Sequence, residues 1–93
     1  MGWLLRKPEI ISLTDEHLDE LKTGCRFMQA SDKRASAENG YPVQSAGFGE
    51  VVPWSQVNGY AVMFYHPRDG KSVKRQLYRN NWRAWTDLNG VPI

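Results

Sequence analysis

The second half of the chain consists of β-forming runs separated by turn-forming pairs, and this pattern restricts the possible folds most strongly. Residues 60–65 (YAVMFY) are rich in residue types that favour strands, and residues 73–78 alternate between apolar and polar side chains. Turn-forming pairs stand before, between and after these runs, at Asn58-Gly59, Asp69-Gly70, Asn80-Asn81 and Asn89-Gly90. We therefore predict two consecutive antiparallel hairpins, the second of which returns through residues 82–88.

Residues 12–24 (SLTDEHLDELKTG) carry the signals of a short helix. Ser12 or Thr14 is suited to the N-cap, acidic residues follow in the first turn, and Gly24 suits the position just after the helix. We predict a helix of about two turns, which is too short to be stable without a sheet to pack against.

Two further strands are predicted in the first half. Residues 25–30 (CRFMQA) alternate as a strand, and residues 45–54 (SAGFGEVVPW) form a strand in which Gly47 and Gly49 indicate a bulge or a close backbone contact. The predicted fold is therefore α+β and mainly β: a short N-terminal helix is followed by an antiparallel sheet of four to five strands.

The length of 93 residues suits one domain and leaves no room for two independent cores. We assign residues 1–12 to a lead-in, residues 13–90 to the β domain and residues 91–93 to a lead-out. A domain of this size is marginally stable alone or is supported by neighbouring chains.

The sequence offers little for catalysis or metal binding. Cys25 is the only cysteine, which excludes an intrachain disulfide and a multi-cysteine zinc site, and we interpret it as a small buried or half-buried hydrophobic residue. His17 lies in an acidic helical stretch and His66 precedes Pro67 at a hairpin end, so neither belongs to a catalytic motif. We expect no enzymatic activity, no metal and no cofactor.

The charge pattern argues against nucleic acid as a partner. The net charge of +2 is spread along the chain, and residues 71–83 form the one locally basic run. We interpret this run as a solvated strand face, with contact to an anion as the alternative. No apolar stretch approaches the roughly 18–20 residues of a membrane span, and the N-terminus lacks the pattern of a signal peptide. We expect a soluble chain made in the cytoplasm, without membrane insertion.

Residues 79–90 (RNNWRAWTDLNG) place Trp82 and Trp85 three positions apart. On a regular strand these two indoles lie on opposite faces, so one of them packs inward and the other meets a neighbouring subunit or a ligand. We favour structural roles for both, counting a subunit contact as structural, and contact of one with a receptor is the alternative.

The order of these pieces resembles the knob-type domain of phage tail fibres and R-type pyocin fibres. The resemblance rests on LDELKTG before a strand, a proline-containing loop, a glycine-containing strand, a hairpin and the closing WRAWTDL, and it covers roughly residues 13–89. It implies a virion tail component made in the host cytoplasm. Such a module binds a receptor or connects fibre segments, works as a homotrimer and has no catalytic residues in the knob itself.

A receptor-binding role gives the aromatic and polar side chains a specific chemistry. Sugars stack C–H groups on aromatic rings, while arginine and asparagine donate directional hydrogen bonds to hydroxyl groups. For binding to a bacterial surface polysaccharide or another receptor, our candidates are Trp54, Tyr65, Tyr78, Arg79, Asn80, Asn81 and Trp82. Our candidates for the core or for subunit contacts are Phe27, Phe48, Phe64 and Trp85.

The same composition suits a protein interface, because tryptophan, tyrosine and arginine dominate interface hot spots. Composition therefore does not separate a glycan from a subunit. The alternative function is a small phage-encoded inhibitor that binds a host protein through this aromatic and basic face.

Overall fold

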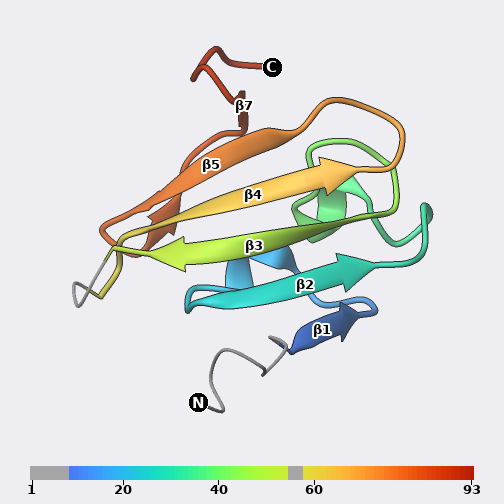
Figure 1. Cartoon of the computed structure of the whole chain (residues 1–93), viewed down its shortest axis with the longest axis horizontal. Coiled ribbons are helices and arrows are strands. Elements are labelled where there is room, and N and C mark those ends of the chain that lie inside the picture. Colours follow the sequence, from blue (N-terminus) through green and yellow to red (C-terminus); the bar gives the residue numbers. More distant parts are fainter. Residues whose placement is uncertain (1–8, 55–57) are drawn as a thin grey trace, which may run out of the picture.

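The computed structural model describes residues 9–54 and 58–93 and contains one mixed, seven-stranded β-sheet (Figure 1). The strand order is β1-β2-β3-β4-β5-β6, with the short β7 pairing with β5 beside β6. β1 runs parallel to β2, and each of the other neighbouring pairs is antiparallel. The strands are β1 (Ile10–Leu13), β2 (Cys25–Gln29), β3 (Gly47–Pro53), β4 (Ala61–Pro67), β5 (Val73–Tyr78), β6 (Asn81–Trp82) and β7 (Thr86–Asp87).

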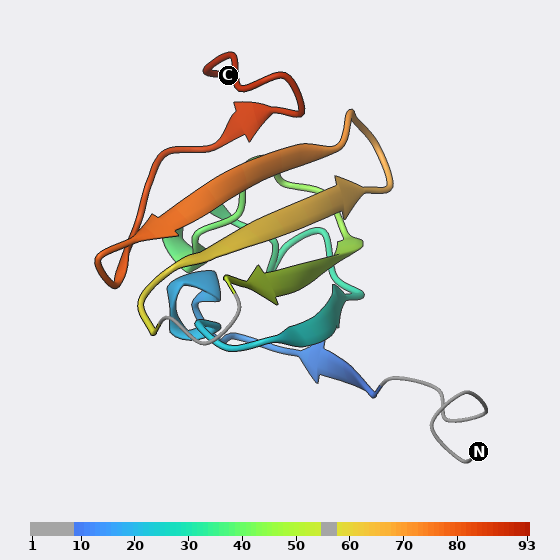
Figure 2. The ribbon, with the colours of Figure 1, turned by 60° about the vertical axis from the view of Figure 1, so that its left-hand side comes forward.

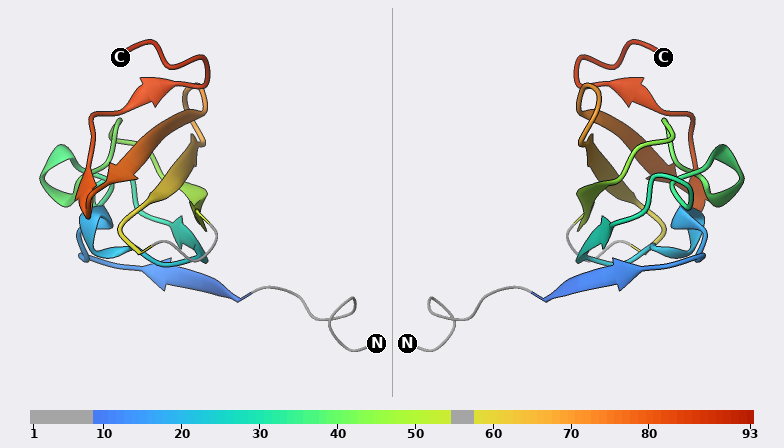
Figure 3. Two further views of the ribbon diagram at one scale, coloured as in Figure 1. Left: turned by 90° about the vertical axis from the view of Figure 1, so that its left-hand side faces the viewer. Right: turned by 90° about the vertical axis from the view of Figure 1, so that its right-hand side faces the viewer.

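Within residues 9–54 and 58–93, the sheet is covered on one face only. The segments with the two 3-10 helices, η1 (Leu18–Glu20) and η2 (Ala37–Asn39), lie on one side of the twisted sheet, and the other side is bare (Figures 2 and 3). We call the covered side the inner face and the bare side the outer face. The registers of β1 to β5 place odd-numbered residues on the inner face and even-numbered residues on the outer face.

The hydrophobic core lies between the inner face and the segments that cover it. Strand residues alternate between buried inner positions and more exposed outer positions, as expected when only one face of a sheet is covered. The core consists of Phe27, Val51, Ala61, Met63, Tyr65, Val73 and Leu77 from β2 to β5, with Leu13, Leu18, Ala35 and Tyr41 packed against them.

The structure confirms the central strands of the prediction. The strands predicted at residues 25–30, 45–54, 60–65 and 73–78 correspond to β2, β3, β4 and β5. The turn after β5 is shifted by one position, because Arg79 and Asn80 are the residues with positive φ, at 50° and 67°. A two-residue turn with both residues in this region matches the twist of the flanking strands.

The predicted N-terminal helix is wrong, and residues 14–24 form a crossover that contains only η1. Local hydrogen bonds replace helical ones: the Thr14 N–H donates to Glu16 Oε1 at 2.7 Å, and the Asp19 N–H donates to His17 Nδ1 at 3.0 Å. Such side-chain bonds compete with a helix that is too short to be stable by itself. The fully buried Leu18 fixes the crossover against the core.

The predicted sheet of four to five antiparallel strands is also wrong. Residues 10–13 form β1 and pair in parallel with β2, which makes the sheet mixed, and β6 and β7 extend it to seven strands. The parallel pair is possible because the crossover of residues 14–24 returns the chain to the same end of the sheet. The fold is therefore mostly β, without the helical part that the prediction assigned to it.

Gly49 marks a close packing contact. It lies in register between Phe27 and Tyr65, whose rings stack across it with centroids 6.1 Å apart and an interplanar angle of 6°. A Cβ at this position would collide with the Phe64 carbonyl oxygen and the Phe27 ring. β3 pairs without interruption with both β2 and β4, so Gly49 does not mark a bulge. The prediction of a close backbone contact at this glycine is correct.

We expect Gly49→Ala to lower the free energy of unfolding by about 1–3 kcal/mol, because the added methyl group must displace the Phe27 ring or the neighbouring strand. Urea denaturation measures the change. Gln76→Ala, on the exposed outer face of β5, is the matched control and should stay within about 0.5 kcal/mol of the parent. Equal stability of the two variants would contradict this account of Gly49.

Candidate functional site

The outer face of the sheet exposes large apolar side chains from neighbouring strands. Exposed apolar patches on small soluble domains mark interaction sites, so this face is the first candidate for function. It carries Ile10, Met28, Phe48, Val52, Trp54 and Tyr78, with exposed fractions between 38% for Met28 and 60% for Phe48.

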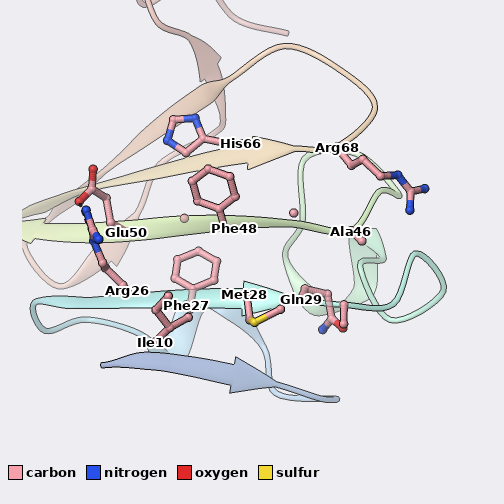
Figure 4. A pocket seen from close by; sticks show the side chains of 13 residues that line it. Ile10, Arg26, Phe27, Met28, Gln29, Ala46, Phe48, Glu50, His66 and Arg68 are labelled. Carbon is pink, nitrogen blue, oxygen red and sulfur yellow. Dashed lines mark ion pairs between the residues drawn. The ribbon is translucent and has the colours of Figure 1, made fainter. Parts of the chain in front are cut away.

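One end of the outer face is hollowed into a groove with a volume of about 540 Å³. Figure 4 shows Ile10, Met28, Phe48 and His66 around it, contributed by β1, β2, β3 and β4. The rings of Phe48 and His66 lie 5.0 Å apart at 38°. The lining of the groove is predominantly apolar. We call this region the apolar groove.

The charged groups at the ends of the apolar groove are already paired. Arg26 faces Glu50 at 4.0 Å, and Arg68 binds both Asp32 and Asp69 at 2.8 Å. The pKa of Asp32 is held below its ordinary value by the hydrogen bond from the Ala46 N–H and then by Arg68. The groove therefore presents apolar surface without a free charge among its described lining residues.

Three aromatic rings line up at the opposite end of the outer face. The pairing of β3 with β4 continues one step beyond β3, where the Trp54 N–H donates to the Tyr60 carbonyl oxygen at 3.1 Å. The rings of Trp54 and Tyr60 lie 5.8 Å apart at 29°, and those of Tyr60 and Tyr78 lie 5.5 Å apart at 89°. We call Trp54, Tyr60 and Tyr78 the aromatic row.

Two arginines flank the aromatic row. The guanidinium carbon of Arg83 lies 4.5 Å from the centroid of the Tyr78 ring, and that of Arg79 lies 5.4 Å from it. Arg83 is positioned by its N–H, which donates to the Gln76 carbonyl oxygen at 2.8 Å. A face of this kind offers flat apolar contacts next to rigid donors.

The structure brings together three of the predicted receptor-binding candidates: Trp54, Tyr78 and Arg79. Asn80 and Asn81 lie beside them and serve the turn. The Asn80 N–H donates to the Gly59 carbonyl oxygen at 2.9 Å, and Asn81 Nδ2 donates to the Arg79 carbonyl oxygen at 3.0 Å.

Tyr65 does not reach the surface. It is fully buried, and its hydroxyl donates to the Ser45 carbonyl oxygen at 2.6 Å. Burial raises the pKa of this hydroxyl far above its ordinary value. We therefore assign Tyr65 to the core, because its odd position in β4 points inward.

Tyr60 and Arg83 were not among the residues predicted for the site. Both were detectable by counting register, since Tyr60 falls between Trp54 and Tyr78 once the β3–β4 and β4–β5 pairings are fixed. Arg83 follows from the pairing across the turn after β5, which places it beside Gln76 on the outer face.

Trp82 and Trp85 lie on the same, inner side of the sheet, so the prediction of opposite faces is wrong. β6 ends at Trp82 and the chain is irregular until β7 begins, so strand alternation does not apply between the two. Both indoles pack against the core and contact Arg75, whose guanidinium carbon lies 4.7 Å from the Trp82 ring and 4.6 Å from the Trp85 ring. Trp82 Nε1 donates to the Asp19 carbonyl oxygen at 3.2 Å, and Trp85 Nε1 donates to the Gly40 carbonyl oxygen at 3.0 Å.

Arg75 is the charged centre of this cluster and is only 6% exposed. Its Nη1 donates to Asp19 Oδ1 at 2.7 Å, and its Nη2 lies 3.6 Å from Met63 Sδ. Burial lowers the pKa of Arg75 from its ordinary value, and the bond to Asp19 acts against that shift. An arginine stays charged at such a site, so the indole faces and the carboxylate stabilise a buried cation.

The residues predicted for the core or for subunit contacts are divided between the two faces of the sheet. Phe27 is fully buried and Trp85 packs on the core from the inner side. Phe48 stands exposed in the apolar groove, and Phe64 lies half-buried on the outer face between Glu50 and Lys74.

Within the part of the chain that the structure describes, no group of three or more His, Cys, Asp or Glu side chains is arranged to hold a metal ion. The described helices are all too short to cross a membrane.

We expect Arg75→Lys to lower the free energy of unfolding by about 1–3 kcal/mol, because lysine lacks the planar group that contacts both indoles. Urea denaturation followed by tryptophan fluorescence measures the change, and Trp82 and Trp85 supply two of the four indoles that contribute to the signal. Arg83→Lys makes the same change at an exposed position and should alter stability by less than about 0.5 kcal/mol. A similar effect of both changes would contradict the central role of Arg75.

Comparison with known proteins relates this fold to a fibre. No protein-family model matches the sequence, and no curated protein is significantly similar to it. A solved structure with a similar fold is the P. aeruginosa R1 pyocin fiber comprising C-terminal residues 323–701. The match has a TM-score of 0.70 and 19% sequence identity, and it covers 87% of this chain and 21% of the fibre fragment. The chain is therefore similar in fold to about one fifth of a pyocin fibre fragment.

Proposed function

We propose that this chain is a structural module of a tail-fibre-type assembly that attaches a phage or phage-like particle to a receptor on the bacterial surface. The receptor is a polysaccharide in this proposal, and joining fibre segments is the second role open to the same module. The observation that carries the proposal is the similarity in fold to a pyocin fibre fragment over 87% of the chain. The bare outer face supports it, because such a face suits contacts with other chains and with ligands.

The apolar groove is the surface through which we propose that copies of this chain associate. Its walls are apolar and the charges at its ends are paired within the chain, so a second copy would bury apolar area without leaving a charge unpaired. A small domain with one sheet face uncovered gains stability from such a contact. We propose three copies because the sequence resembles knob-type fibre domains, which are trimers. In a closed ring of three chains, the same contact occurs three times.

Light scattering coupled to size-exclusion chromatography tests the association at micromolar concentration. We expect a mass about three times the 10.7 kDa of one chain. Phe48→Asp should release monomers, because it places a charge in the apolar groove. Val43→Asp changes another exposed apolar residue, outside the strands, and should keep the trimer. A folded parent protein that is monomeric at this concentration contradicts the proposed association.

Adsorption to cells tests the attachment role. We expect the labelled protein to bind strains with intact surface polysaccharide and to lose binding on derivatives that lack it. Phe48→Asp should bind about a hundredfold more weakly, since a monomer loses multivalency. Absence of adsorption to every strain of a broad panel, together with retention of one host protein from lysate, would instead favour the inhibitor function.

A further inference from the structure

We propose that the aromatic row, with Arg79 and Arg83 beside it, binds an acidic sugar of a surface polysaccharide. This inference deepens the proposed function and rests on it for the choice of a polysaccharide as the ligand. It adds the location of the site and the charge class of the sugar.

The aromatic row forms an exposed surface suited to stacking. Trp54 is 51% exposed and Tyr78 is 42% exposed, although both are large rings that proteins usually bury. Tyr60 stacks on Trp54 with an interplanar angle of 29°, which supports the exposed indole from one side. The C–H groups on one side of a sugar ring pack against the negative faces of such rings.

The charge beside the row is not neutralised by the protein. Arg79 and Arg83 form no ion pair with any acidic side chain of the described residues, and all of the acidic residues lie in the described part. The other described arginines each pair with a carboxylate; they are Arg26, Arg34, Arg68 and Arg75. The two unpaired guanidinium groups therefore supply the donors that a sugar carboxylate or phosphate requires.

The turn next to the row holds these donors in place. Arg79 and Asn80 both have positive φ, and the Asn80 N–H bonds to the Gly59 carbonyl oxygen, which connects this turn to the residue before Tyr60. Lys22 Nζ donates to the Asn80 carbonyl oxygen at 3.1 Å and adds a third positive charge. A site whose rings and donors are fixed in advance loses less entropy on binding.

A sugar fits these features better than a nucleic acid. Bases also stack on aromatic rings, but proteins that bind single strands track the phosphate backbone along a basic groove. Here the net charge is +2, the positive groups cluster at one end of the row, and the apolar groove at the opposite end of the outer face has its charges paired.

Titration of the whole protein with two oligosaccharides of equal length tests the charge class. The acidic probe is an oligogalacturonate and the neutral probe is a maltooligosaccharide, and the signal is the indole N–H resonance of Trp54 in NMR spectra. We expect the acidic probe to shift this resonance and to bind at least about tenfold more tightly than the neutral one at low salt. Equal binding of both probes, or tighter binding of an oligothymidine, would overturn the proposal.

Substitutions at the two arginines test the location. Arg79→Gln combined with Arg83→Gln should bring the affinity for oligogalacturonate within about twofold of that for the neutral probe. Lys33→Gln combined with Arg34→Gln removes two positive charges from exposed residues outside the strands and outside the apolar groove, so it is the matched control and should keep the preference for the acidic probe. Unchanged NMR spectra elsewhere would show that the variants are folded. A preserved preference in the double variant would overturn the site.

The two proposals fail in different ways. If oligogalacturonate binds as described but no strain adsorbs the protein, the attachment role fails and the acidic-sugar site stands. If the double arginine variant adsorbs to cells as well as the parent does, the site proposed here fails and the attachment role stands.

Discussion

The contact of Arg75 with Trp82, Trp85 and Asp19 is the interaction on which the rest of the structure depends. Arg75 belongs to the central part of β5, Asp19 to the crossover between β1 and β2, and the indoles to the C-terminal segment. One buried guanidinium therefore ties two other parts of the chain, the crossover and the C-terminal segment, to the inner face. Removing a single partner would leave a desolvated charge without compensation, which makes the cluster cooperative. Because the indoles of Trp82 and Trp85 both pack in this contact, the aromatic rings exposed on the outer face come from other residues.

The alternation of the strands then decides which residues are free for binding. Odd positions of β1 to β5 face inward and even positions face outward, so the same strands supply the core and the exposed surface. Gly49 lets the inner rings of Phe27 and Tyr65 stack closely. The apolar groove and the aromatic row lie at opposite ends of β3, which leaves room for a neighbouring chain at one end and a ligand at the other.

The sequence predicted the elements whose signals are local. β4, β5 and the turn between them follow from residue type and turn chemistry, and β2 follows from alternation. The parallel strand β1 was not predictable in this way, because its pairing depends on a contact across the crossover and residues 10–13 carry no periodic signal of their own. The prediction that Trp82 and Trp85 lie on opposite faces was wrong because β6 ends at Trp82, so the alternation of a strand does not extend to Trp85. The prediction for Tyr65 was wrong because tyrosine is a residue type that suits a binding site, whereas the register of β4 points this side chain into the core.

The separation of the two faces also explains how a fold can persist while its surface changes. Residues that hold this fold, such as Arg75, Gly49 and Phe27, point inward or sit between inward rings. Trp54, Tyr78 and Arg83 point outward, where substitutions cost little stability. The TM-score of 0.70 at 19% identity to the pyocin fibre fragment shows a similar fold built from largely different residues. The exposed rings and unpaired arginines add nothing to the core, and we propose ligand binding as the reason for their arrangement in one row.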